Sequence, residues 1–164
     1  MSKTPKQSAG LIMFRRRTTE LEVFLVHPGG PYWSKKEEGA WTLPKGEYLE
    51  GEEPLAAALR EFQEETGFCA TEPFIELGSV LQKSGKVVFA WAFEGDCDPA
   101  HLVSNRCQIE WPPRSGKHVE IAEVDRGAWF SLPRATFAIR KEQLPLLQRL
   151  EQELGKTLTV KSSD

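Results

Sequence analysis

Three glutamates, Glu61, Glu64 and Glu65, recur at spacings of three and four residues in a segment with helical periodicity. Residues at these spacings lie close together on one side of a helix. Like charges placed this way repel one another, at a cost of about 0.2–0.5 kcal/mol per pair. A hard divalent cation would relieve that repulsion, and carboxylate oxygens are the ligands that Mg²⁺ and Mn²⁺ prefer. The three side chains therefore predict a site for Mg²⁺, which could also accept Mn²⁺.

Signals for the start and the end of one helix surround these glutamates. Pro54 suits the first helical position, because the N–H that proline lacks would have no partner there. Residues 55–66 have helical periodicity, and Gly67 suits the position just after the last turn. Before the helix, Gly46 and Gly51 predict flexible turns. The apolar residues of the segment form a separate stripe that predicts a core-facing side: Leu55, Ala58, Leu59 and Phe62.

The fixed residues between positions 46 and 68 resemble the Nudix box. The constrained positions of that motif are filled by Gly46, Glu52 and the run Arg60-Glu61-Phe62-x-Glu64-Glu65-x-Gly67-Phe68. The alternative is an ordinary amphipathic surface helix with an acidic outer side. The resemblance implies an α/β fold, a Nudix-type α/β/α sandwich with a mixed β-sheet. It also implies that Glu61, Glu64 and Glu65 are metal ligands.

Two other charged residues of the box are assigned mainly to support. Arg60 can bridge carboxylates through two parallel hydrogen bonds, and could thereby fix the loop before the helix against the helix itself. Glu52 is the natural partner in that loop, although direct metal ligation by Glu52 stays open. We count Arg60 with Glu61 and Glu64 among the catalytic candidates.

Residues outside the helix are candidates for substrate binding. Lys45, just before Gly46, could reach a phosphate, or could be an ordinary solvated lysine. Trp41, and with it Tyr32 and Trp33, could stack on a nucleobase, although buried or loop aromatics are more common. Arg114 lies in a loop with two prolines and could bind a distal phosphate, with a plain polar loop as the alternative.

A further acid is expected outside the box, because carboxylates on one helix leave the far side of a substrate uncovered. The distal half offers four: Glu110, Glu120, Glu123 and Asp125. Several members of the Nudix family carry a functional glutamate six residues before a tryptophan, and Glu123 stands at that spacing before Trp129. The resemblance therefore favours Glu123 as ligand or general base, with Glu120 second. The alternative is an exposed glutamate in an acidic loop.

The composition is that of a globular protein, with 27% charged and 40% hydrophobic residues. We expect one domain over residues 1–164, with mobile tails at 1–7 and 156–164. The net charge of −3 disfavours a non-specific grip on nucleic acid. The first residues lack the apolar core of a signal peptide, and the longest apolar run, 87–93, is too short for a bilayer. Three cysteines without paired spacing fit a reducing cytoplasm.

The remaining chain predicts strands and two further helices. A hairpin is expected at 9–15 and 21–27, followed by a loop rich in glycine and proline and then the helix of the box. Two more strands are expected around a Ser84-Gly85 turn. The predicted strands are 9–15, 21–27, 41–43, 76–83, 86–94, 103–111 and 129–132, and the later helices are 134–139 and 143–154.

The resemblance implies metal-dependent hydrolysis of a phosphoanhydride bond in a nucleoside diphosphate linked to another group, so the expected partner is a small nucleotide. The runs A-G-L-I-M-F-R-R and W-T-L-P-K-G-E are similar to nucleoside triphosphate and dinucleoside polyphosphate hydrolases. The proline found after the box in ADP-ribose hydrolases is absent, and so is the tyrosine found there in some dinucleoside polyphosphate hydrolases. The alternatives left open are ADP-ribose or nucleotide-sugar hydrolysis, RNA 5′-end hydrolysis, and nucleotide sensing without turnover. The intact set of glutamates speaks against sensing.

Overall fold

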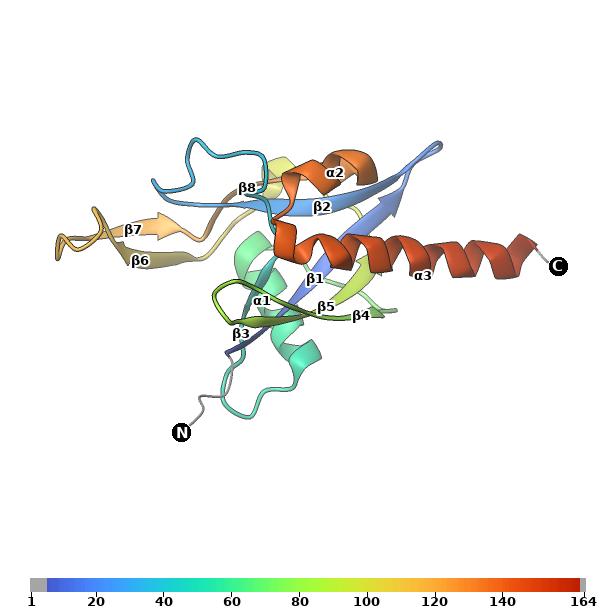
Figure 1. Ribbon diagram of the computed structural model, residues 1–164, viewed down its shortest axis with the longest axis horizontal. Helices are drawn as coiled ribbons and strands as arrows, with labels where there is room; N and C mark the ends of the chain where they lie inside the picture. The colour runs from blue at the N-terminus through green and yellow to red at the C-terminus, as the bar shows by residue number, and fades with distance from the viewer. Residues whose placement is uncertain (1–5, 163–164) are drawn as a thin grey trace.

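A six-stranded mixed sheet forms the centre of the protein (Figure 1). The computed structural model describes residues 6–162, with the side chains of residues 6–155. The strands follow the order β4-β5-β1-β2-β8, and β3 also pairs with β1. Their bounds are β1 (Gln7–Arg16), β2 (Leu21–Pro28), β3 (Lys45–Glu47), β4 (Ile75–Leu81), β5 (Val87–Glu94) and β8 (Val124–Ser131).

Strand β1 organises this sheet because it pairs with three other strands. Its first half is antiparallel to β3, with Ala9 opposite Gly46, and its second half is antiparallel to β2, with Met13 opposite Phe24. Along its other edge it runs parallel to β5. The predicted hairpins β1–β2 and β4–β5 are both confirmed. The parallel β1–β5 pair makes the sheet mixed, as expected.

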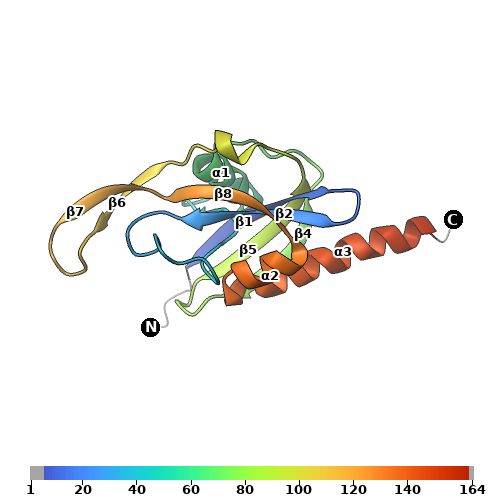
Figure 2. The same cartoon turned by 90° about the horizontal axis from the view of Figure 1, so that it is seen from above.

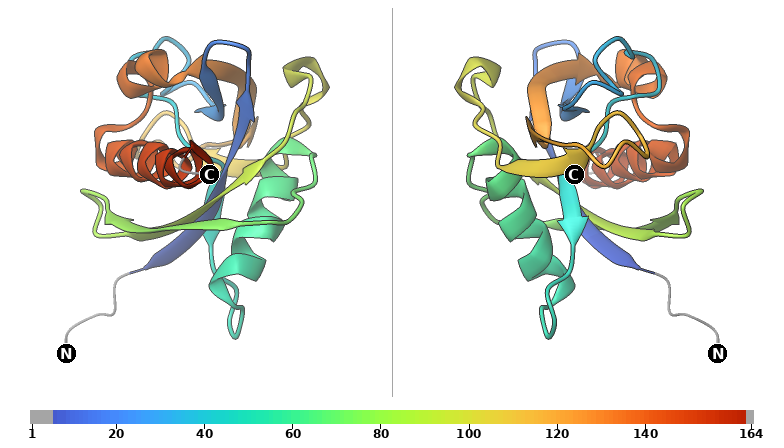
Figure 3. Two further views of the ribbon diagram at one scale, coloured as in Figure 1. Left: turned by 90° about the vertical axis from the view of Figure 1, so that its right-hand side faces the viewer. Right: turned by 90° about the vertical axis from the view of Figure 1, so that its left-hand side faces the viewer.

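Helices cover both faces of the sheet, as the two side views show (Figure 3). Helix α1 (Pro54–Thr66) packs on one face, where Leu11 and Met13 of β1 point toward it. Helices α2 (Leu132–Ala138) and α3 (Leu144–Ser162) cover the other face, which receives Ile12 and Phe14. This alternation along a buried strand confirms the α/β/α sandwich. No helix in the described part of the chain is long and apolar enough to cross a membrane.

The ends of α1 follow the signals in the sequence. Pro54 occupies the first turn, and Gly67 ends the helix at φ 79° with its N–H bonded to the carbonyl of Gln63 at 2.8 Å. Gly51 also adopts a positive φ, 76°, in the turn before the helix. The prediction of a flexible turn at Gly46 is wrong, because Gly46 lies inside strand β3.

The sequence missed two strands, β3 and β7, and misplaced other boundaries. Strands β6 (Arg106–Glu110) and β7 (His118–Ala122) form a separate hairpin that projects from the sandwich (Figure 2). β7 is short, and its first three residues are exposed, so it was not predicted as a strand. β8 is longer than the predicted 129–132, and 41–43 forms only isolated bridges. Short 3₁₀ helices occur at η1 (Pro99–His101) and η2 (Lys141–Gln143).

The extent of the last helix is the other difference. Strand β1 already begins at Gln7, and helix α3 continues through Ser162. The helix expected at 143–154 therefore runs eight residues further than predicted. The added segment contains no proline, and Gly155 alone does not end a helix. Of the tails expected at 1–7 and 156–164, residues 1–5 and 163–164 lie outside the described residues.

Truncation of Phe62 should test the packing of α1 on the sheet. Phe62 is fully buried and packs edge-on against Phe93 at 5.3 Å. Phe62→Ala is expected to lower the free energy of unfolding by about 3–5 kcal/mol, measured by urea denaturation. Phe137→Ala is the matched control, because Phe137 is 69% exposed and should change stability by less than about 0.5 kcal/mol. Equal losses in both variants would contradict the assigned core.

Candidate functional site

Three carboxylates from two distant parts of the chain meet at one end of α1. Glu61 and Glu65 come from the helix, and Glu123 comes from the single residue between β7 and β8. One oxygen of each lies within 4.8 Å of the others. Glu61 and Glu65 are only 8% and 7% exposed, so their charges have little water around them. An all-oxygen donor set of this kind fits a hard divalent cation such as Mg²⁺ or Mn²⁺.

Backbone hydrogen bonds at the end of α1 explain how Glu123 arrives there. The last carbonyls of a helix lack partners inside the helix. Here the carbonyls of Glu64 and Thr66 accept hydrogen bonds from the N–H groups of Asn105 and Val103, at 2.8 and 2.9 Å. The carbonyl of Asn105 in turn accepts from the N–H of Glu123 at 3.0 Å. The segment that caps the helix, residues 103–105, therefore also fixes the backbone of Glu123.

Gly46 leaves the space that Glu61 occupies. A Cβ atom built on Gly46 would lie 2.0 Å from both Cδ and Oε2 of Glu61. Strand β3 therefore passes directly beside this carboxylate, and any side chain at position 46 would displace it. The glycine is required here for close approach.

Arg60 links the helix to the loop before it. Its Nε and Nη2 donate to the two carboxylate oxygens of Glu52, each at 2.9 Å. Its Nη1 donates to Glu61 at 2.8 Å and to Glu64 at 3.1 Å. The two hydrogen bonds from Arg60 hold the pKa of Glu52 at about 2, and the carboxylates raise the pKa of Arg60. Both carboxylate oxygens of Glu52 accept from Arg60, and Oε1 also accepts from the N–H of Leu49.

Burial sets the protonation of the site. Loss of water raises the pKa values of Glu61 and Glu65, and the negative charge of Glu123 raises both further. Lys45 adjoins them, and its N–H donates to Glu65 Oε2 at 2.9 Å. Burial lowers the pKa of the Lys45 ammonium. Added positive charge among the carboxylates would offset the desolvation that favours their neutral forms.

Other predicted site residues lie outside the group of three. Glu64 is exposed, and its carboxylate accepts hydrogen bonds from Arg60 Nη1. Glu120 is exposed on the β6–β7 hairpin and forms an ion pair with Arg106 at 2.9 Å. Arg114 lies at the tip of the same hairpin with φ 61°, and its N–H donates to Glu110. Among the described residues, the structure therefore brings Glu123 to the helix carboxylates, while Glu64, Glu120 and Arg114 lie outside that group.

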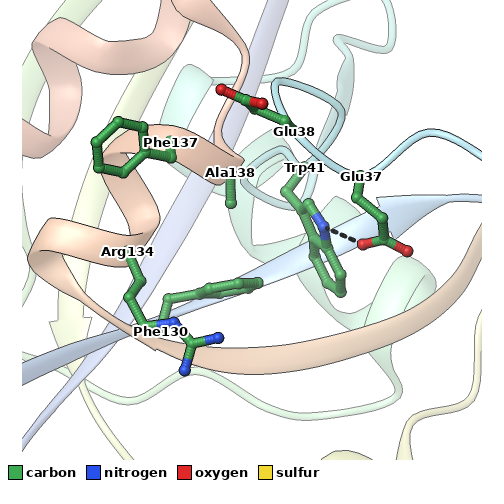
Figure 4. Close-up of a pocket in the computed structure, with 7 residues that line it drawn as sticks. All are labelled: Glu37, Glu38, Trp41, Phe130, Arg134, Phe137 and Ala138. Carbon is green, nitrogen blue, oxygen red and sulfur yellow. Dashed lines mark hydrogen bonds between the residues drawn. The ribbon is translucent and has the colours of Figure 1, made fainter.

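Trp41 forms one wall of an open pocket of about 400 Å³ (Figure 4). Its ring is 5% exposed and packs against His27 and Phe130, at centroid distances of 5.2 and 4.9 Å. Its Nε1 donates to Glu37 at 3.2 Å. These contacts bury most of Trp41 within the sandwich. The residues that line the pocket are Glu37, Glu38, Trp41, Phe130, Arg134, Phe137 and Ala138.

Sequence patterns missed Gln143. It is fully buried, accepts from the N–H of Leu43 at 3.2 Å and donates to Thr42 Oγ1 at 2.8 Å. These bonds fix the segment that leads into Lys45. A single glutamine before an amphipathic helix carries no periodic signal, so only its burial identifies it.

The mixed-sheet α/β/α sandwich thus brings two glutamates of one helix together with a third from the residue before β8. The chain matches the NUDIX domain over residues 4–150. It therefore belongs to the Nudix family.

Two curated relatives and one solved structure illustrate the similarity. The rat bis(5′-nucleosyl)-tetraphosphatase (asymmetrical) is 35% identical over 100 residues, which cover 54% of this chain and 64% of the relative. The RNA pyrophosphohydrolase of Bartonella bacilliformis is 35% identical over 107 residues, covering 56% of this chain and 58% of that protein. The matched part therefore spans less than two thirds of either relative. A Caenorhabditis elegans Ap4A hydrolase in a binary complex shares the fold, with a TM-score of 0.63 at 21% identity over 92% of this chain and 98% of that one.

Gly46→Ala should weaken metal binding with little effect on stability. The added methyl group must displace the Glu61 carboxylate, which can rotate away because it ends a flexible side chain. We expect affinity for Mn²⁺ to fall roughly 10–100-fold by titration calorimetry, as for other changes that misorient a ligand. The free energy of unfolding should change by less than about 1.5 kcal/mol.

The control for this variant is Gly155→Ala. A Cβ at Gly155 meets nothing within 4 Å, so this change should leave Mn²⁺ binding as in the wild type. Unaltered Mn²⁺ affinity in Gly46→Ala would show that the clearance beside Glu61 has no part in metal binding.

Proposed function

We propose that residues 1–164 form one hydrolase domain that cleaves a phosphoanhydride bond in a nucleoside diphosphate linked to another group, with a divalent metal as cofactor. The single observation that carries the proposal is the convergence of Glu61, Glu65 and Glu123 within 4.8 Å, next to Lys45. Structural ion pairs do not explain three adjoining acids with two of them buried. Family membership is consistent with this chemistry.

In this proposal Glu61, Glu65 and Glu123 hold Mg²⁺, and Glu64 joins them from the exposed side, where it already shares Arg60 with Glu61. Mn²⁺ has the same preference for oxygen ligands. A metal ion bound there would neutralise phosphate charge and make a bound water more acidic. Gly46 and Arg60 orient the Glu61 carboxylate.

Glu123 is our candidate for accepting a proton from the attacking water. Its carboxylate makes no hydrogen bond or ion pair with another residue in the described part of the chain, so its oxygens are available. Its backbone is held near the end of α1 by the carbonyl of Asn105, and in this proposal its carboxylate would face the substrate. Lys45 would bind a phosphate oxygen at the end of β3.

The substrates we favour are nucleoside triphosphates or dinucleoside polyphosphates. Support comes from the sequence runs that flank the box and from the rat relative, whose name specifies a bis(5′-nucleosyl) tetraphosphate. The Bartonella relative makes triphosphorylated RNA 5′ ends the second candidate. The three free cysteines, one of them exposed, are consistent with the cytoplasmic location that we propose.

A substrate panel tests the proposed function. Purified protein with Mg²⁺ is incubated with nucleoside triphosphates, dinucleoside polyphosphates, ADP-ribose, a nucleotide sugar and a triphosphorylated oligoribonucleotide, and the products are separated by chromatography. We expect turnover that stops on chelation of the metal, with kcat/KM highest for a substrate with three or more phosphates. A tenfold preference for ADP-ribose or the nucleotide sugar would overturn the substrate assignment, and no turnover of any compound would overturn the activity.

The role of Glu123 can be separated from that of Glu120 by matched substitutions. Glu123→Gln should lower kcat at least tenfold, because the general-base role and the ligand role both require the charge. General-base catalysis typically contributes about 10²–10⁴-fold to the rate. Its melting temperature should stay the same or rise, since the change relieves repulsion from Glu61 and Glu65. Glu120→Gln removes an exposed pair with Arg106 and should retain normal kcat. The reverse pattern would transfer the role to Glu120.

A further inference from the structure

Arg140 is a partly buried cation that has no ion-pair partner among the residues that the structure describes. Its Nε is inaccessible to solvent, and its guanidinium forms no hydrogen bond or ion pair with any residue that the structure describes. Glu142 acts on it electrostatically, without forming an ion pair. Burial lowers the pKa of Arg140. A buried charge is costly unless it is paired, so this side chain is suited to receive a negatively charged group.

The backbone holds Arg140 close to the segment that ends at Lys45. The N–H of Arg140 donates to the carbonyl of Trp41 at 2.9 Å. Gln143, in the next turn, bonds to Thr42 and to the N–H of Leu43. Arg140 is thus attached to the start of the segment 41–45, whose last residue, Lys45, bonds through its N–H to the carboxylate of Glu65.

An aromatic loop lies on the other side of Arg140. The guanidinium carbon is 4.7 Å from the centre of the Trp33 ring, a cation–π distance. Trp33 packs edge-on against Tyr32 at 4.9 Å, and the Tyr32 ring is 56% exposed. The loop is fixed at its far end, where His27 Nε2 bonds to the carbonyl of Lys36 at 2.6 Å. Trp33 restricts the guanidinium without neutralising it.

We infer that Arg140 binds a phosphate group of the substrate beside Lys45, with Trp33 packed on its guanidinium. The inference rests on the proposed function and specifies its substrate class. A guanidinium matches phosphate oxygens through two parallel hydrogen bonds. In this assignment the carboxylate site and Lys45 bind the phosphates on either side of the cleaved bond. Arg140 would then bind a further phosphate, which only a substrate with three or more phosphates provides. Arg140 is in this way a specificity-determining residue.

Binding of magnesium tripolyphosphate, measured by titration calorimetry, tests the site directly. Arg140→Gln should weaken binding at least tenfold, within the roughly 10- to 100-fold expected for loss of a charge-assisted phosphate contact. Arg140→Lys keeps the charge but lacks the planar guanidinium, so its affinity should lie between those of the wild type and Arg140→Gln. The matched control is Lys141→Gln, which removes an exposed positive charge at the next position and should bind as the wild type does.

Two results would overturn the assignment. Wild-type affinity in Arg140→Gln would show that Arg140 does not contact the phosphates. An equal loss in Arg140→Gln and Lys141→Gln would show a diffuse effect of positive charge in place of a specific contact.

Thermal unfolding separates binding from a structural role. Without ligand, Arg140→Gln should melt at the wild-type temperature or above it, because the substitution removes an unpaired charge. Magnesium tripolyphosphate should raise the melting temperature of the wild type more than that of the variant. A ligand-free melting temperature several degrees below the wild type would assign Arg140 to structure and overturn the inference.

Turnover gives the last comparison. For a substrate with three or more phosphates, Arg140→Gln should raise KM about tenfold or more with kcat nearly unchanged, while a diphosphate-linked substrate should show little change. An equal rise in KM for both substrate classes would show that Arg140 does not determine specificity. The binding and unfolding measurements need no turnover, so they can fail or succeed independently of the proposed function.

Discussion

The repulsion among buried carboxylates is the constraint on which the site depends. When the carboxylates are ionised, unit charges 4.8 Å apart repel by roughly 3.5 kcal/mol at an effective dielectric constant near 20. That is about ten times the repulsion of an exposed pair on a helix surface. Helix α1 nevertheless buries Glu61 and Glu65 and meets a third acid, Glu123. The surrounding structure must therefore hold these groups in place against a force that would separate them.

Each neighbouring element supplies part of that restraint. Gly46 in β3 lets the backbone lie against Glu61, and Arg60 bonds to Glu61 while it is itself fixed by Glu52. The carbonyl of Asn105 holds the backbone of Glu123. The core on both sides of β1 keeps α1 and the sheet in register, so these contacts rest on packing as much as on hydrogen bonds. A divalent cation would turn the remaining repulsion into attraction.

The fold and the helix of the site could be predicted because their signals are local. Pro54, Gly67 and the apolar stripe of α1 each act over one or two helical turns. Hairpins with short turns are local in the same sense. The sandwich itself came from the resemblance to a known motif, and the sheet order confirmed it.

Features that depend on tertiary contact were harder to obtain from the sequence. The resemblance ranked Glu123 above Glu120, but only the capping of α1 by residues 103–105 explains its position. Nothing in the spacing of Gly46 distinguished a turn from a close approach, because glycine serves both. Strand β7 and the continuation of α3 lacked patterns that decide boundaries. Gln143 and Arg140 had no periodic signal, since their importance lies in burial.

The resulting charge distribution has two sides, and this asymmetry matches the chemistry of a metal–polyphosphate. In the proposed function, the carboxylates of α1 and Glu123 would hold a cation, while Lys45 and Arg140 would bind phosphate oxygens. Burial shifts the pKa values of Glu65, Lys45 and Arg140 in the direction that favours their neutral forms, although Lys45 and Glu65 already offset part of each other's charge. A metal ion alone would add charge only to the acidic set, and free phosphate only to the basic set. A polyphosphate bound to a metal ion would meet the acidic groups and the basic groups at once. The complex is therefore more complementary to the site than the metal ion or the polyphosphate alone.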